Sequence, residues 1–234
     1  MNNNMLLPDL IFVPEGVNEY DLPLFLTHHN FDVLLHQSEV KYIKDLCDYI
    51  DTNKIEGDVL ECGVWKGGSA VLLRKYLARK WFVLNRTMLL ADFFGVNPRF
   101  NIIEMHPEEL ATFKAAKDLN IHPPKIGDVI QLLSSFNFFD STVHFLCGDV
   151  RVSLKSKPLN KIAFLHVDVD FYEATTTVLE TAYPAVTAGG VILINDYNIK
   201  NLNCKQAVMA FREKYRIDEP IVEIGRYMAY WIKG

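Results

Sequence analysis

The sequence lacks any block of lysine or arginine, and its 24 basic residues are outnumbered by 29 acidic ones. This balance, a net charge of −5, argues against nucleic acid or a membrane surface as the main partner. No apolar run approaches the length that spans a bilayer. The first residues carry Pro8 and no basic segment, so they do not read as a secretory signal peptide. We therefore expect a cytoplasmic protein.

Cysteine is scarce, and its spacing is not that of a metal or redox motif. The chain has four scattered cysteines and no C-x-x-C pair: Cys47, Cys62, Cys147 and Cys204. We expect buried free thiols in a reducing compartment, because neither a zinc site nor a disulfide framework has this pattern.

The G-x-G-x-x-G signature of dinucleotide-binding proteins is also missing. In its place, residues 58–69 read DVLECGVWKGGS, with the spacing E-x-G-x-x-x-G. Apolar residues lead into the segment as in a strand, and helical spacing of apolar residues follows it. Glycine allows the backbone to approach a ligand closely, and a helix N-terminus offers free N–H groups.

Glu61 at the end of this strand suits a cationic ligand better than a pyrophosphate. S-adenosylmethionine, which carries an ammonium and a sulfonium group, meets that description. The alternative is a strand-to-helix turn that needs its glycines for geometry alone.

Apolar strand segments alternate with amphipathic helical segments along most of the chain. Strands are expected at 58–60, 88–94, 143–149, 162–168 and 191–194, then at 221–224 and 227–232. The last two are joined by a short connection, as in a hairpin. This order predicts an α/β fold with a doubly wound, mostly parallel sheet of seven strands that ends in an antiparallel hairpin.

We expect one domain over residues 38–234. Residues 1–37 are irregular and rich in aromatic residues, so they are expected to form an arm that packs on the domain or on a partner subunit of a homo-oligomer. Residues 95–127 contain four prolines and separate two core elements. Long loops in compact domains tend to be functional, so this segment is the candidate lid over the substrate.

Acidic residues follow the predicted parallel strands. In open α/β sheets, ligands bind outside the carboxyl ends of the strands. Asp92, after the second strand, could accept both ribose hydroxyls of a nucleotide. Taken singly, each acid could instead cap a helix or be solvated in a loop. The full set is Glu61, Asp92, Asp149, Asp168 with Asp170, and Asp196.

The densest group predicts a metal site. If the fourth and fifth strands are neighbours, Asp168, Asn195 and Asp196 converge, and three oxygen donors suit a hard cation such as Mg²⁺. Asp170 could then act as general base toward a substrate hydroxyl. Its alternative role is to cap the helix that starts near Tyr172.

Several segments together resemble the macrocin-type O-methyltransferases. They are ECGVWKGGS, DFFGVNP, the GDV after the third strand, HVDVDFYEATTTVLETAYPAVTAGGVILINDY and CKQAVMAFREKY. The resemblance implies a class I methyltransferase fold, S-adenosylmethionine as cofactor, Mg²⁺ at Asp168, Asn195 and Asp196, and Asp170 as base. Asn195 stands where the family has aspartate. The cofactor-binding positions that it implies are Glu61, Gly63, Gly67, Asp92 and Asp149. We expect Ser69 and Asp168 to contribute to cofactor binding as well.

The resemblance therefore predicts an enzyme that methylates a hydroxyl of a sugar, a glycosylated small molecule or a glycan. Two alternatives remain. A degenerate methyltransferase fold could only bind nucleosides or act as a scaffold, which the Asn195 departure favours. An NAD-dependent oxidoreductase would use the same sheet, but the first turn lacks its glycine spacing.

Overall fold

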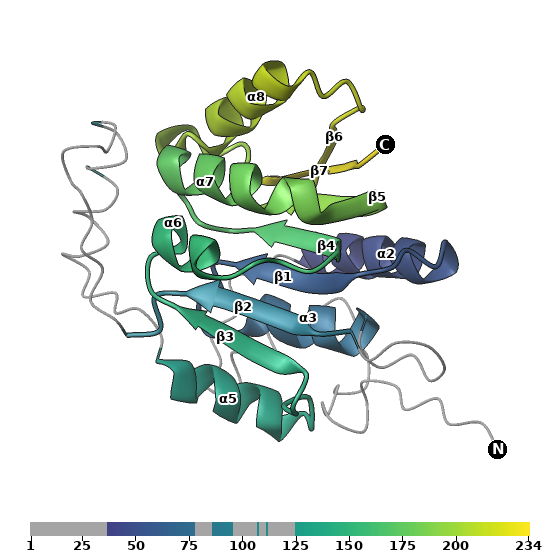
Figure 1. Ribbon diagram of the computed structural model, residues 1–234, viewed down its shortest axis with the longest axis vertical. Helices are drawn as coiled ribbons and strands as arrows, with labels where there is room; N and C mark the ends of the chain where they lie inside the picture. Colours follow the sequence, from purple (N-terminus) through teal and green to yellow (C-terminus); the bar gives the residue numbers. More distant parts are fainter. Residues whose placement is uncertain (1–36, 78–85, 96–106, 108–110, 112–124) are drawn as a thin grey trace.

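The computed structural model describes residues 37–77, 86–95, 107, 111 and 125–234 (Figure 1). Most of the predicted arm and lid lies outside these residues. Gln37 begins the first described helix, and Ile126 begins another, so these two ends of the predicted segments belong to the folded domain. No helix in the described ranges is both long enough and apolar enough to cross a membrane.

A single seven-stranded sheet forms the centre of the molecule, in the order β3-β2-β1-β4-β5-β7-β6. The first five strands pair in parallel, and β7 runs antiparallel to both β5 and β6. The predicted sheet, with one reversed strand contributed by the terminal hairpin, is confirmed. The strands are β1 Asp58–Cys62, β2 Met88–Asp92, β3 Val143–Cys147, β4 Ile162–Val167, β5 Val186–Ile194, β6 Val222–Ile224 and β7 Met228–Ile232.

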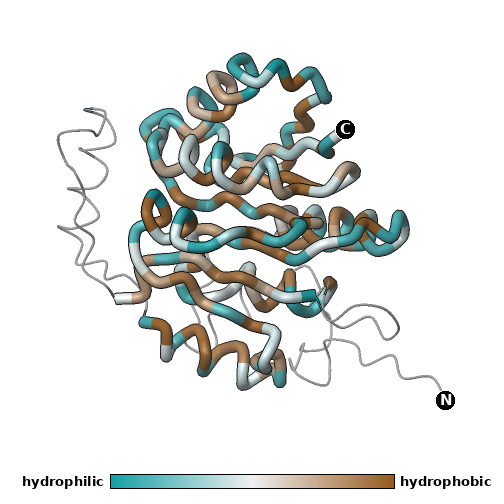
Figure 2. The backbone as a smooth tube through the Cα atoms, in the orientation of Figure 1, coloured by the Kyte–Doolittle hydropathy of each residue, from teal (hydrophilic) through white to brown (hydrophobic). Residues whose placement is uncertain are grey.

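Helices cover both faces of the sheet and bury two apolar layers (Figures 1 and 2). One layer lies under α2 Gln37–Thr52, α3 Gly68–Leu77 and α5 Ile126–Ser135. The other lies under α6 Val150–Ser153, α7 Tyr172–Ala182 and α8 Cys204–Tyr215. Three short 3-10 turns, η4 Leu154–Ser156, η5 Tyr183–Ala185 and η6 Lys200–Leu202, complete the described elements. Strands buried on both faces explain the nearly continuous apolar runs in the sequence.

Each strand differs from its expected range by at least one residue, and two of these differences have a clear local reason. Glu61 belongs to β1 rather than to the turn, since its backbone pairs with both β2 and β4. β5 begins at Val186, so Gly189 and Gly190 lie within the strand. The pairing of β4 with β5 is irregular there, and a β-carbon on Gly190 would meet the Val186 side chain at 2.6 Å. The glycines therefore permit an irregular strand rather than precede it.

The four cysteines are free, as expected, but Cys147 is exposed whereas the other three are buried. The prediction of a buried thiol is wrong at this position. β3 is an edge strand, and only two of its five residues are buried.

Candidate active site

The candidate active site lies at the carboxyl ends of β1, β4 and β5. These parallel strands are adjacent, with Cys62 beside Val167 and Val167 beside Ile194 at their last paired positions. Whatever follows each strand is therefore delivered to the same edge of the sheet. The next residues along the chain are Gly63, Asp168 and Asn195.

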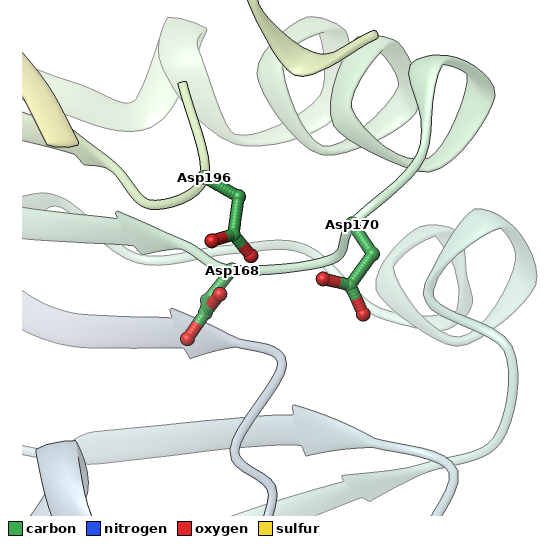
Figure 3. A group of neighbouring side chains, drawn as sticks. All are labelled: Asp168, Asp170 and Asp196. Atoms are coloured by element: carbon green, nitrogen blue, oxygen red, sulfur yellow. The ribbon is translucent and has the colours of Figure 1, made fainter. Parts of the chain in front are cut away.

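Three carboxylates, Asp168, Asp170 and Asp196, gather at this edge, as Figure 3 shows. One oxygen of each lies within 4.8 Å of the others. Asp170 reaches the cluster through a turn after the end of β4. β4 ends at Val167, and Asp170 adopts a left-handed backbone with φ 65° instead of an extended one. Asp170 is not a helix cap either, because α7 has Phe171 at its N-cap.

The side-chain amide of Asn195 contacts the cluster through one atom and is buried at the other. Its side-chain Nδ2 donates a hydrogen bond to Asp168 Oδ1 at 3.1 Å. Its Oδ1 is buried and has no hydrogen-bond partner. The amide thus occupies one acceptor position of Asp168 and keeps a free oxygen of its own.

Burial raises the pKa of all three carboxyls in the cluster. Burial and the charge of Asp196 raise the pKa of Asp168 to about 7, against the opposing effects of His166 and Asn195. Loss of water, followed by the charges of Asp168 and Asp196, raises the pKa of Asp170 well above its ordinary value, although the residue as a whole is exposed. The pKa of Asp196 is also raised, mainly by burial. Like charges this close favour protonation or a bound cation.

Glu61 lies completely inside the protein, which the sequence did not indicate. Its Oε1 accepts hydrogen bonds from the Ser69 hydroxyl on α3 and from His166 Nδ1 on β4, the latter at 3.1 Å. Its Oε2 is buried without a partner. Burial alone would lower the pKa of His166, but the hydrogen bond to Glu61 and the neighbouring negative charges raise it.

Asp92 fastens the end of β2 to the turn that follows β1. Its Oδ2 accepts backbone N–H groups of Val64 at 2.7 Å and Trp65 at 2.9 Å. Its Oδ1 accepts the N–H of Phe93 at 2.5 Å. A carboxylate has about four acceptor positions, so roughly one remains for a ligand.

The two glycines of the turn meet protein atoms rather than open space. A β-carbon on Gly63 would lie 1.7 Å from the backbone oxygen of Asp168. A β-carbon on Gly67 would lie 3.1 Å from Val129 Cγ1 on α5. Both have left-handed φ, 84° and 90°. The geometric reading of these glycines is therefore sufficient to account for them.

Asp149 caps a helix, which is the alternative role considered for each of the acidic residues. It is the N-cap of α6 and accepts the N–H of Arg151 at 2.9 Å. The Arg151 guanidinium also contacts both carboxylate oxygens. These contacts outweigh burial and lower the pKa of Asp149. Its carboxylate is therefore largely occupied by its own neighbour.

His166 is the site residue whose place beside Glu61 the sequence did not indicate. The one available signal was an ionisable residue at the fifth position of the otherwise apolar run IAFLHV. A fully buried imidazole needs a partner, but the sequence does not say which residue lies beside it.

Comparison with known proteins finds a family that matches most of the chain. A family model described as Macrocin-O-methyltransferase (TylF) matches residues 33–233. Mycinamicin III 3''-O-methyltransferase of Micromonospora griseorubida is 35% identical over 181 residues, 76% of this chain and 68% of the relative. The 8-demethyl-8-(2,3-dimethoxy-alpha-L-rhamnosyl)-tetracenomycin-C 4'-O-methyltransferase of Streptomyces olivaceus is 29% identical over 184 residues, 76% of this chain and 66% of the relative.

Among solved structures, that of the O-methyltransferase NovP has a TM-score of 0.78 at 27% identity, covering 87% of this chain and 83% of that one. The family match spans the whole seven-stranded sheet and the candidate active site. This protein therefore belongs to the macrocin O-methyltransferase family of enzymes.

Proposed function

We propose that this enzyme transfers a methyl group from S-adenosylmethionine to a hydroxyl of a sugar or of a glycosylated small molecule, assisted by a divalent cation such as Mg²⁺. The observation that carries the proposal is the gathering of three carboxylates beside the glycine turn, at the ligand-binding edge of a parallel sheet. S-adenosylmethionine supplies an electrophilic methyl group on its sulfonium when bound.

Two acidic residues fit the ends of the cofactor. The free Oε2 of Glu61 is a buried acceptor that the ammonium group of the amino-acid end would satisfy. Asp92 keeps about one acceptor position for a ribose hydroxyl while holding the turn. Both residues lie at ends of neighbouring strands, so one extended ligand could reach both.

The remaining residues assigned to the cofactor shape its surroundings. Gly63 and Gly67 let the turn take its left-handed conformation, and Ser69 holds Glu61. Asp149 organises the start of α6 after β3, next to the end of β2. Asp168 borders both the cofactor turn, through Gly63, and the carboxylate cluster.

The donor set also fits a hard cation. Asp168, Asn195 and Asp196 would hold it, because the carboxylates provide charge and the free Asn195 Oδ1 provides a neutral oxygen. A cation there would offset the burial and the like charge that raise the carboxyl pKa values, and would favour ionisation of a nearby acceptor hydroxyl.

Asp170 is the proposed general base. It is the most exposed member of the cluster, so a substrate can reach it. Its carboxylate would take the proton of the acceptor hydroxyl as that oxygen attacks the methyl group. The sugar acceptor is proposed from the relatives, one of which acts on a rhamnosyl-bearing tetracenomycin.

The test combines binding with turnover. Calorimetry is expected to detect S-adenosylmethionine and not NAD. Methyl transfer from labelled S-adenosylmethionine is then measured on a panel of nucleotide-linked and natural-product-linked sugars, with Mg²⁺ or with chelator. Binding of NAD alone would favour the oxidoreductase. Binding of S-adenosylmethionine with no transfer across the panel would favour a nucleoside-binding scaffold.

A further inference from the structure

A buried histidine stands directly beside the proposed ammonium-binding glutamate. Glu61 on β1 and His166 on β4 are register partners in adjacent parallel strands. Both side chains are 0% exposed, and His166 Nδ1 lies 3.1 Å from Glu61 Oε1. The contact connects β1, which leads into the glycine turn, with β4, which is followed by Asp168.

The hydrogen bonds of Glu61 are unevenly distributed over its two oxygens. Glu61 Oε1 is the acceptor in this pair when the His166 tautomer carries its proton on Nδ1. The Ser69 hydroxyl, on α3, donates to the same oxygen, Oε1. No group in the described residues donates to Oε2, which is buried. A buried acceptor without a donor is costly unless a ligand supplies one.

We propose that His166 is a positioning residue for cofactor binding, which rests on the function proposed above. By holding Oε1 together with Ser69, it fixes the Glu61 side chain so that Oε2 stays available for the ammonium group of S-adenosylmethionine. The carboxylate is then ordered before the ligand arrives, and the ligand does not bear that entropy cost. This accounts for an imidazole in a strand whose other five side chains are apolar.

The test uses two amide variants that place the donor differently. Asparagine puts an amide N–H near the position of histidine Nδ1, whereas glutamine moves its amide toward the position of Nε2. Ligands are S-adenosylmethionine, S-adenosylhomocysteine and 5'-methylthioadenosine, the last of which lacks the amino-acid end. Affinities are measured by calorimetry on full-length protein, with folding checked by circular dichroism and thermal melting.

His166→Gln is expected to weaken both amino-acid-bearing ligands by about tenfold and methylthioadenosine by less than about twofold. His166→Asn is expected to stay within about threefold of wild type for all three. Wild-type affinity for S-adenosylmethionine in a folded His166→Gln variant would overturn the proposal. Equal loss for all three ligands would also overturn it, because it would mean that His166 only supports the fold. A wild-type enzyme that binds none of the three refutes the proposed function instead.

If either variant does not fold, the wild-type enzyme still decides. With ¹⁵N-labelled histidine, the His166 Nδ1–H resonance is expected to move when S-adenosylhomocysteine binds, and to move little with methylthioadenosine. A resonance that responds equally to both ligands, or to neither, would contradict the proposal.

Discussion

The backbone oxygen of Asp168 lies 1.7 Å from the point that a β-carbon on Gly63 would occupy. The turn after β1 and the end of β4 therefore touch backbone to backbone, and the Asp168 N–H also donates to Cys62 O at 2.7 Å. Gly63, at the start of the turn after β1, thus fixes the position of Asp168, the first residue of the carboxylate cluster. The turn after β1 and the carboxylate cluster therefore pack together as one unit.

Gly63→Ala is expected to lower the free energy of unfolding by about 2–5 kcal/mol, because φ 84° strains alanine and the methyl group meets backbone that cannot rotate away. Urea unfolding measures it. Gly127→Ala in α5 is the control, since nothing lies within 4 Å of its added β-carbon, and a neutral change or a gain of up to about 1 kcal/mol is expected. A Gly63→Ala protein within about 1 kcal/mol of wild type would contradict the account.

A second region holds the outer edge of the sheet together. The buried guanidinium of Arg74 on α3 donates to Phe138 O, Asp140 Oδ2 and Thr142 Oγ1 at 3.1, 2.5 and 2.7 Å. Burial opposes ionisation of Asp140, but the hydrogen bonds from Thr142 and the charge of Arg74 together outweigh it and lower the pKa of the carboxyl. The partly exposed carboxylate therefore contributes a modest, pH-dependent term to stability.

Asp140→Asn is expected to cost about 0.5–1 kcal/mol at pH 7 after allowance for solvent screening. A carboxyl whose folded pKa is depressed stabilises above its unfolded pKa, about 3.9, and this is lost as pH falls through the folded value. The difference from wild type should therefore shrink below about pH 4. Urea unfolding at pH 7 and pH 3.5 measures it. Glu56→Gln, which breaks an exposed 3.3 Å pair with Lys161, is the control with little expected effect at either pH.

If the proposed cation site exists, Asn195→Asp should lower the melting temperature without metal and raise the stabilisation that Mg²⁺ provides. The change removes the amide donor to Asp168 Oδ1 and adds a charge to a crowded cluster. Metal-free protein should melt at a lower temperature, whereas Mg²⁺ should bind more tightly and raise the melting temperature further than in wild type. Chelator should lower wild-type activity, and Mg²⁺ should restore it. Activity and melting that ignore both chelator and Mg²⁺ would remove the metal from the proposal.

The sheet was predictable because its pattern is local. Runs such as IAFLHV are apolar enough to require burial on both faces, and the glycine segment after β1 marks a strand-to-helix turn. The convergence of Asp168 with Asn195 followed once β4 and β5 were assumed to be neighbours.

The partners of individual side chains were not predictable, since they depend on contacts between distant segments. Nothing in the sequence indicates that Glu61 is held by His166, 105 positions away, or that Asp92 holds the N–H groups of Val64 and Trp65. Asp170 reaches the cluster through a left-handed turn that its residue type does not require. Functional side chains satisfied by long-range hydrogen bonds look, in sequence, like side chains free to meet a ligand.

Variants of Asp170, the proposed general base, distinguish a loss of catalysis from a loss of ligand binding. Asp170→Asn keeps the shape of the side chain and removes the proton acceptor, so kcat is expected to fall by about 10²–10⁴ with S-adenosylmethionine affinity nearly unchanged. Asp168→Asn, the matched control in the same cluster, should lose rate together with Mg²⁺ affinity, because it is proposed to hold the cation. Turnover is measured with saturating Mg²⁺, alongside calorimetric titrations of both ligands. Near-normal turnover in Asp170→Asn would exclude Asp170 as the base. A parallel loss of Mg²⁺ affinity in that variant would make Asp170 a fourth cation ligand beside Asp168, Asn195 and Asp196, which its closeness to the two carboxylates would permit.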